Sequence, residues 1–495
     1  MTGAKPDKSH GYVTEVTYPF NYYRELNPNI QALALTLAGV TPPALDSAFT
    51  YLELGCGLGL STLVHAAANP QARFIATDII PEHIAVASGV AKDAGLTNVE
   101  FRELAFEDMH DAGLPPFDFV AMHGVWSWIN DFNRAALTSF LDKFLKPGGA
   151  LYVSYNAQPG HSAIMPLRQL MMTGFTQAAG SVPDKVEAGL AYAQSVRDLD
   201  AAFFRTNPMI GRYLDDIAPL GRNYLAHEYF NADWWAFYVA DIARDFAPLG
   251  LTFAASALVM DALPHLNFTP DMCSALAQIA DPVRRETLKD FFVNRQFRRD
   301  LFVRAAARQD DANAAVDSLP FAAAVLPSNI HRVAGATFLM GEVRPQAEVA
   351  TAIATAMLDG PHSVDAMMAM PAFAQFSTAS VREGLLTMAG LGAAEPALST
   401  THFEERRART ARLNQVLWAR AIRGDEVSGT ASPVTGGAVG LGKTEQLFLL
   451  ARARGEDPVE LVLKAMPDQS GTAVAHALGI FETARLPLLR NLGIV

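Results

Sequence analysis

Short apolar segments alternate with helical patterns over the first 155 residues of the chain. The apolar segments cover residues 49–54, 73–77, 99–102, 117–123 and 151–155. Each reads as a buried parallel strand, because such strands form short continuous apolar runs bounded by turn residues. Helical patterns separate them, mainly at residues 60–68, 81–94 and 133–144. This alternation predicts a doubly wound α/β sheet.

The alternation stops after residue 155. Helical patterns fill residues 160–230, interrupted by Pro183, Pro208 and Pro219. A further helix at 233–246 and a strand-like run at 251–260 indicate that the sheet then resumes. Ligands of open α/β sheets bind outside the carboxyl ends of the strands. We therefore expect residues 160–230 to be a helical insertion over those ends, as a lid or a substrate wall.

The remaining chain is mostly helical in pattern. A strongly charged helix is expected over residues 282–308, with Arg298, Arg299 and Arg304 on a solvated face. Short helices and a glycine-rich turn at 390–396 then resemble a helix–turn–helix with a small wing. Basic residues are sparse there, which favours an interaction or regulatory module over a DNA reader.

These patterns predict a Rossmann-like sheet with a helical insertion, followed by mostly helical middle and C-terminal parts, the last winged-helix-like. The expected divisions are an N-terminal cofactor-covering segment at 1–45, a catalytic domain at 46–262, a helical middle domain at 263–343 and a C-terminal domain at 344–495.

Composition narrows the functional classes. Half of the residues are hydrophobic and the formal net charge is −12, which argues against general nucleic-acid binding. Two cysteines allow neither a disulfide framework nor a cysteine-based zinc site, and no other metal-ligand constellation is evident. No signal-like start or long apolar run occurs, so we expect a cytoplasmic protein without stable membrane insertion. A homodimer is compatible with these features.

A glycine-rich turn follows the first expected strand and opens a helix. Its sequence at residues 53–59 is Glu-Leu-Gly-Cys-Gly-Leu-Gly. Glycines let the backbone turn sharply and approach a ligand, and the helix start presents unpaired N–H groups. Asp78 ends the second strand, where a carboxylate can accept hydrogen bonds from ribose hydroxyls. Glu53 suits a role near the amino-acid part of a nucleotide-linked cofactor.

The turn, Asp78, an Asp-containing fourth strand (Phe-Asp-Phe-Val, 117–120) and Leu-Lys-Pro-Gly-Gly-Ala-Leu (145–151) together resemble class I methyltransferases. The resemblance implies S-adenosylmethionine as cofactor. Many members carry Asp where this chain has Ala105, so adenine contact here would be stacking on Phe106 or a backbone bond. The expected cofactor contacts are Tyr22, Glu53, Gly55, Cys56, Gly57, Gly59, Asp78, Ile79, Ala105, Phe106 and His123.

A narrower resemblance spans nearly the whole chain. It rests on the aromatic opening (11–28), His-Gly-Val-Trp-Ser-Trp-Ile (123–129), Tyr-Val-Ser-Tyr-Asn (152–156), Leu-Ala-His-Glu-Tyr-Phe (225–230) and Asn-Arg-Gln-Phe-Arg-Arg (294–299). These runs resemble bacterial methyltransferases with a methyltransferase regulatory domain, including rickettsial protein-lysine methyltransferases acting on outer-membrane proteins. The resemblance implies a lysine-bearing protein as substrate.

Methyl transfer is an in-line displacement, so the enzyme mainly aligns the acceptor and excludes water. A lysine acceptor must also lose a proton. Catalytic candidates after the fourth and fifth strands are His123, Trp126, Tyr155 and Asn156. Trp126 and Trp128 could enclose an alkylammonium by cation–π contact or serve as core aromatics. A small-molecule acceptor, and a binding protein with a vestigial cofactor site, are the alternatives.

A second glycine-rich run, Gly-Ala-Val-Gly-Leu-Gly-Lys-Thr (437–444), matches the phosphate-binding loop pattern. A true loop of this kind follows a buried strand, whereas the preceding residues 428–435 are polar and contain proline. We interpret this run as a flexible loop that caps a helix beginning near Lys443.

Overall fold

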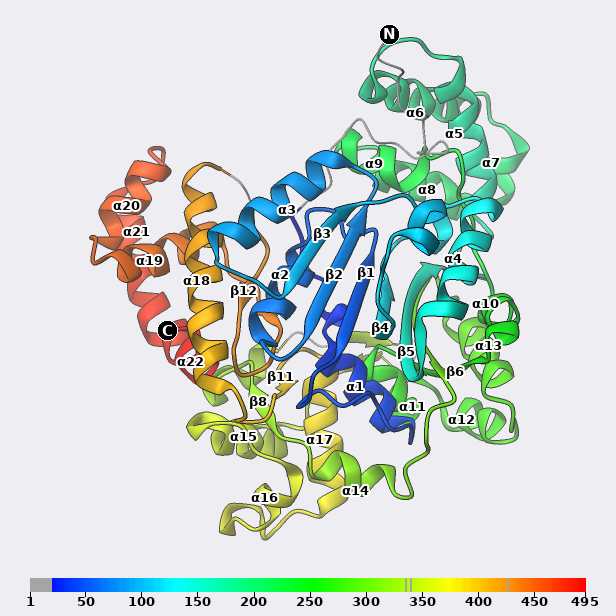
Figure 1. Ribbon diagram of the computed structural model, residues 1–495. Helices are drawn as coiled ribbons and strands as arrows, with labels where there is room; N and C mark the ends of the chain where they lie inside the picture. The colour runs from blue at the N-terminus through cyan, green and yellow to red at the C-terminus, as the bar shows by residue number, and fades with distance from the viewer. Residues whose placement is uncertain (1–19, 334–335, 339–340, 425–426) are drawn as a thin grey trace.

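The computed structural model describes residues 20–333, 336–338, 341–424 and 427–495. The first part of the expected N-terminal segment, residues 1–19, lies outside the described residues. A seven-stranded sheet of order β3-β2-β1-β4-β5-β7-β6 forms the centre of the molecule (Figure 1). Its strands are β1 (Thr50–Leu54), β2 (Arg73–Asp78), β3 (Val99–Glu103), β4 (Phe117–Met122), β5 (Leu145–Asn156), β6 (Leu251–Ser256) and β7 (Phe297–Arg304).

Five neighbouring strands run parallel, and β7 pairs antiparallel with both β5 and β6. Leu54 at the end of β1 pairs with Thr77 of β2 and with Met122 of β4. The residues that follow these three strands therefore meet at one edge of the sheet. The predicted α/β sheet is confirmed.

Helices cover the two faces of the sheet. They bury apolar side chains of the strands in continuous cores, as Leu137 and Phe140 do against β4 and β5. The helices next to the sheet are α1 (Pro28–Leu37), α2 (Leu60–Ala68), α3 (Pro81–Asp93), α4 (Asp131–Phe144), α10 (Val239–Phe246) and α13 (Pro282–Val293). Helices α11 (Pro264–Asn267) and α12 (Pro270–Ala277) precede α13 in the chain.

The predicted helical insertion is present and forms a separate corner of the molecule (Figure 1). It has its own core, which includes Leu167, Val186 and Phe230. Its helices are α5 (Met165–Gln177), α6 (Val182–Asp198), α7 (Ala202–Thr206), α8 (Pro208–Ile217) and α9 (Arg222–Tyr229).

The prediction of one charged helix over residues 282–308 is wrong for its second half. Helix α13 ends at Val293, Asn294 adopts a φ of 49°, and the chain turns back as β7. The sheet therefore continues past residue 262, where we expected the catalytic domain to end.

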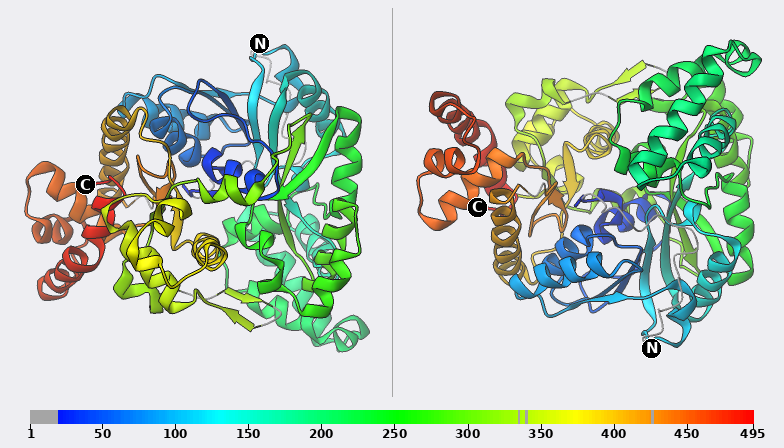
Figure 2. Two further views of the ribbon diagram at one scale, coloured as in Figure 1. Left: turned by 90° about the horizontal axis from the view of Figure 1, so that it is seen from below. Right: turned by 90° about the horizontal axis from the view of Figure 1, so that it is seen from above.

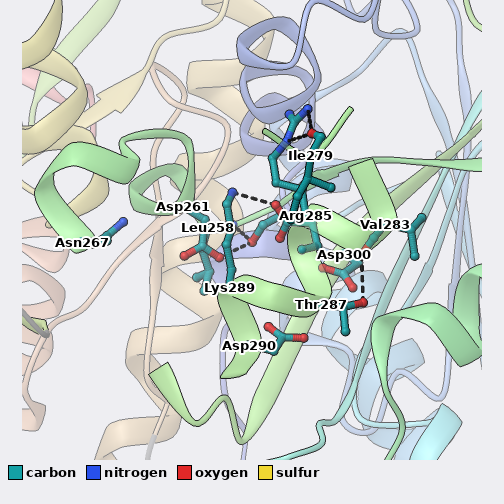
Figure 3. Close-up of polar contacts among 12 residues, drawn as sticks. Leu258, Asp261, Asn267, Ile279, Val283, Arg285, Thr287, Lys289, Asp290 and Asp300 are labelled. Atoms are coloured by element: carbon teal, nitrogen blue, oxygen red, sulfur yellow. Dashed lines mark hydrogen bonds and ion pairs between the residues drawn. The ribbon is translucent and has the colours of Figure 1, made fainter. Parts of the chain in front are cut away.

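The arginines of β7 do not lie on a solvated face either. Arg298 is buried and binds the carboxylates of Glu286, Asp290 and Asp300. Figure 3 shows Asp290 and Asp300 together with Lys289 and Asp261, which extend this charged cluster between α13 and β7. Arg304 donates to the carbonyl oxygens of Asp142 and Leu145.

The C-terminal half is mostly helical, with short strand pairs. The expected wing at 390–396 contains β11 (Ala394–Pro396), which pairs with the distant β8 (Phe321–Ala323) and not with a neighbouring hairpin strand. The other elements up to residue 422 are α14 (Ala312–Asp317), β9 (Ala336–Phe338), β10 (Gly341–Val343), α15 (Ala347–Ala356), α16 (Val364–Met368), α17 (Thr378–Gly390) and α18 (Phe403–Ile422).

The last part of the chain packs beside α2 and α3, the helices that contact β2 and β3. Helix α18 lies alongside α2 and α3, and α19–α22 form the outer edge beyond it (Figure 2). These elements are β12 (Thr430–Ala431), β13 (Ala438–Val439), α19 (Lys443–Arg454), α20 (Pro458–Ala465), α21 (Gly471–Ile480) and α22 (Leu486–Asn491). Among the described residues, no helix is both long and apolar enough to cross a bilayer.

Candidate functional site

A cavity of about 500 Å³ opens at the sheet edge where β1, β2 and β4 end. This size lies within the range of small-molecule and cofactor sites. Its wall combines the glycine turn, the ends of β2, β4 and β5, and side chains from α9 and β7. The residues after β1 and β2 that line it are Glu53, Gly55, Cys56, Gly57, Leu58, Gly59, Leu60, Ser61, Asp78, Ile79, Ile80 and His83.

The glycine turn leaves room for a ligand because its three glycines adopt positive φ angles. A Cβ on Gly55 would lie 2.7 Å from Val125, and one on Gly59 would lie 2.6 Å from Phe101. Both glycines are thus required by close packing behind the turn. A Cβ on Gly57, by contrast, would meet no atom within 4 Å. The turn therefore presents its backbone to the cavity at Gly57.

Backbone N–H groups fix the carboxylate of Asp78. Gly57 N–H donates to one oxygen at 2.8 Å, and Ile80 N–H donates to the other at 2.9 Å. The His83 ring lies 3.3 Å from the second oxygen. A carboxylate offers about four lone-pair sites, so this arrangement leaves acceptor capacity toward the cavity.

Glu53 lies at the end of β1 in a nearly solvent-free position. Its carboxylate accepts a short hydrogen bond from the Thr62 hydroxyl. Burial raises the pKa of Glu53 to about 7, against the opposing effect of that hydrogen bond and with a smaller contribution from Asp78. The fold thus holds a carboxyl group close to its titration point beside the glycine turn.

His123 follows β4 and is held between aromatic rings. Its Nδ1 lies 2.9 Å from the Tyr152 hydroxyl, and its ring packs on Tyr23 with centroids 4.1 Å apart. Burial, with a smaller contribution from the charge of Arg299, lowers the pKa of His123 to about 3. The ring is therefore neutral at physiological pH and is a poor acceptor for a proton from an alkylammonium.

Part of the cavity wall is built by segments distant in sequence. Trp128 follows β4 and Asn156 ends β5, while α9 contributes Tyr224, His227 and Glu228. Strand β7 adds Phe297 and Arg299. Burial raises the pKa of Glu228 to about 7. This part of the wall thus combines aromatic rings with a carboxyl group, which is the chemistry that recognises a cation.

The structure brings most of the predicted site residues together. The predicted residues in the cavity wall are Glu53, Gly55, Cys56, Gly57, Gly59, Asp78, Ile79, Ala105, Phe106, His123 and Asn156. Three others lie elsewhere. Trp126 is buried against Phe246, and the Tyr155 hydroxyl donates to Asp300 at 2.6 Å, so both belong to the core behind the cavity.

Tyr22 is the third residue that lies outside the cavity. Its neighbours Asn21 and Tyr23 line the cavity instead. Its backbone N–H donates to the Ser428 hydroxyl, and its ring packs beside His65. A Cβ on Gly437 would lie 2.8 Å from the Tyr22 hydroxyl. The absence of a side chain at Gly437 in the second glycine-rich run thus leaves room for the Tyr22 ring. Helix α19 begins at Lys443, as predicted.

Sequence reasoning missed the contribution of α9 and β7 to the cavity. Tyr224, Glu228, Phe297 and Arg299 were not assigned a role, although three of them lie in runs that carried the narrower resemblance. Those runs were unusual for a generic methyltransferase, and this was the signal that could have pointed to a role of α9 and β7 in the cavity.

Two family models match the chain. Residues 45–195 match a methyltransferase domain, and residues 221–304 match a predicted methyltransferase regulatory domain. The second match includes α9 of the cavity wall and both strands, β6 and β7, that complete the sheet.

Relatives and solved structures agree with these matches. An uncharacterised protein of Synechocystis is 34% identical over 98% of this chain and 99% of its own length. A protein of Rickettsia prowazekii is 27% identical over 61% of this chain and 53% of its own length. The structure of PKMT2 from Rickettsia typhi in complex with AdoHcy has a TM-score of 0.68 at 17% identity, covering 94% of this chain and 98% of that one. The chain belongs to the class I methyltransferases with a methyltransferase regulatory domain, enzymes that use S-adenosylmethionine.

Proposed function

We propose that this enzyme methylates the ε-amino groups of lysine side chains in a protein. The observation that carries the proposal is that Trp128, Tyr224 and Glu228 all line the cavity. Aromatic rings and a carboxylate attract an alkylammonium through cation–π and charge interactions. The similarity to the rickettsial PKMT2 fold supports the same acceptor class.

The residues around the glycine turn fit the cofactor. Gly57 gives its backbone room for close approach, and Asp78 has acceptor capacity for the ribose hydroxyls. Phe106 and Glu53 both line the cavity, where Phe106 would stack on the adenine and Glu53 would lie near the amino-acid end. When bound, S-adenosylmethionine supplies an electrophilic methyl group on a positively charged sulfur.

The chain's own residues then have two tasks. Asn156 and His123 flank the reacting region and can orient the acceptor by hydrogen bonds. Tyr23 and Trp128 exclude water from it, which strengthens the remaining electrostatic interactions. Positioning of this kind supplies most of the rate in a displacement reaction.

The size of the cavity also favours a slender acceptor. S-adenosylmethionine takes up a large share of the roughly 500 Å³. The space left suits the unbranched side chain of a lysine that enters from a protein surface.

Radiolabelled methyl transfer tests the proposal. The purified protein is incubated with labelled S-adenosylmethionine and a lysate of its source organism, and protein is separated from small molecules. We expect label in protein, released as methylated lysine on acid hydrolysis. Label confined to small molecules, or to other amino acids, would rule out the lysine assignment.

A further inference from the structure

We infer that Glu228, from the segment matched as a regulatory domain, binds the ammonium group of the acceptor and removes its proton. The inference rests on the proposed lysine specificity and deepens it. It also gives α9 a direct part in the chemistry.

The position of Glu228 is the first support. It lies on α9 in the wall of the cofactor cavity, which Tyr224 and His227 of the same helix also line. The end of α9 is held in place, because the Trp234 indole N–H donates to the Glu228 carbonyl at 2.9 Å. The Asn231 amide also donates to the His227 carbonyl at 2.7 Å. The side chain therefore projects from a fixed backbone.

The second support is that the Glu228 carboxylate is largely withdrawn from water and is not neutralised. Within the described part of the chain, it has neither a hydrogen-bond donor nor an ion-pair partner. A buried carboxylate without a partner carries a large desolvation penalty, which a cationic ligand would relieve. Most other carboxylates of the insertion are paired, as Glu187 is with Arg222 and Asp215 with Arg197.

The surrounding groups do not compete for this role. Burial raises the pKa values of Tyr213, Tyr224 and Tyr229, so these hydroxyls stay neutral near Glu228. The other titratable side chains in the cavity wall are Tyr23, Glu53, Cys56, Asp78, His83, His123, His227 and Arg299. From α6, Glu187 faces α9 through its pair with Arg222.

Among the cavity groups with a resolved pKa, Glu228 is the best suited proton acceptor. His123 remains unprotonated well below neutral pH, and Glu53 accepts the Thr62 hydrogen bond beside the glycine turn. A base works best when its pKa lies near the working pH, and burial brings the pKa of Glu228 to about 7.

The proposed step balances as follows. The ammonium proton moves to the Glu228 carboxylate, which frees the nitrogen electron pair. That pair forms the nitrogen–methyl bond while the sulfur–methyl bond breaks and its electrons remain on sulfur. The proton on Glu228 then passes to solvent, and the product amine leaves as its methylammonium form.

Ligand binding tests the inference without relying on turnover. The probe is Nα-acetyl-lysine amide, compared with the uncharged norleucine analogue, titrated by calorimetry into full-length protein saturated with S-adenosylhomocysteine. We expect wild type to prefer the lysine probe, with an affinity that increases as pH rises through about 7, because Glu228 ionises in that range.

Three variants define the outcome. Glu228→Gln should bind the lysine probe about tenfold more weakly, without pH dependence and with unchanged S-adenosylhomocysteine affinity. Glu228→Asp should keep the pH dependence at reduced affinity. Glu187→Gln is the matched control, because Glu187 also lies in the insertion but outside the cavity, and it should behave as wild type.

The results separate the two proposals. If Glu228→Gln binds and titrates like wild type, the role of Glu228 is refuted while lysine methylation can still stand. If wild type does not distinguish the two probes, the ammonium site itself is refuted. The labelling experiment reports independently on lysine methylation, because methylated lysine would be detected with either result for Glu228.

Discussion

At the scale of single residues, Gly57 is the glycine of the cofactor turn at which an added side chain would meet the cofactor and not the protein. Because a Cβ there meets no protein atom within 4 Å, a larger residue is accommodated by the fold and enters the cavity. We expect Gly57→Arg to abolish S-adenosylmethionine binding in calorimetry. The φ of 54° adds a strain of about 1–2 kcal/mol, which lowers the melting temperature slightly.

Gly95 provides the matched control for Gly57. It has a φ of 66°, also has no atom within 4 Å of a built Cβ, and lies in the turn after α3, away from the cavity. Gly95→Arg should show a similar strain with normal cofactor binding. Equal binding by both variants would contradict the position of the cofactor.

Glu53 links the same site to pH. The unfolded carboxyl titrates near 4.5 and the folded one near 7, so the folded state retains a proton between these values. The stabilisation of the cofactor-free protein by this group is therefore lost as pH rises through that window, by about 1.4 kcal/mol for each pKa unit. Relative to Glu53→Gln, we expect wild type to lose stability between about pH 5 and 7 in chemical unfolding.

Glu100 should behave differently and serves as the control. Hydrogen bonds from Arg102 lower its pKa, so its carboxyl is ionised in both states above about pH 5. The stability difference between wild type and Glu100→Gln should stay flat over the same range. A parallel trend for both variants would show that the slope does not come from Glu53.

At the scale of elements, the packing of α13 against β7 is stabilised by one buried cation, Arg298. Removal of the Arg298 guanidinium leaves Glu286, Asp290 and Asp300 without their central partner. We expect Arg298→Leu to reduce the free energy of unfolding by about 3–5 kcal/mol, as for other broken buried pairs. Urea unfolding measures this loss.

Arg304 on the same strand is the comparison. Its guanidinium donates to the carbonyl oxygens of Asp142 and Leu145, which are neutral, and its ion-pair partner Asp142 is exposed. Arg304→Leu should therefore cost only about 1 kcal/mol. A similar loss of unfolding free energy in both variants would mean that the buried ion-pair cluster stabilises the fold no more than the hydrogen bonds of Arg304 do.

These same elements explain what sequence patterns could and could not predict. The parallel strands were found because β1 and its neighbours are continuous apolar runs, buried on both faces. Strand β7 was missed because its charged residues are buried by ion pairs with α13, and such pairing leaves no mark on apolar periodicity.

For the candidate site, too, sequence patterns predicted the location but not which side chains face it. The cavity opens at the strand ends where the sequence placed the candidate site, but Tyr155 and Asn156 are successive residues of β5 and point to opposite faces. Asn156 lines the cavity, whereas Tyr155 contacts Asp300 in the core. Which of two neighbours faces the ligand depends on the register, and the register is set by strands distant in sequence.

At the scale of the whole molecule, the C-terminal part supports the helix that carries the cofactor turn. Leu413 and Leu417 of α18 pack with Leu60, Leu63 and Val64 of α2. Arg409 of α18 donates to the Ala66 carbonyl at the end of the same helix. Since α2 begins directly after Gly59, a change in α18 should be transmitted to cofactor binding.

Leu413→Ala tests this coupling between the two ends of the chain. Truncation of this fully buried side chain leaves a cavity against α2, and such changes cost about 2–5 kcal/mol. We expect weaker S-adenosylmethionine binding and faster hydrogen exchange of the α2 amides. Leu447→Ala is the control, because Leu447 is equally buried but packs in the outer C-terminal core, which contains no α2 residue. Both variants should lose stability, and only Leu413→Ala should lose cofactor affinity. Equal affinity in the two variants would mean that α18 stabilises the fold without acting on the site.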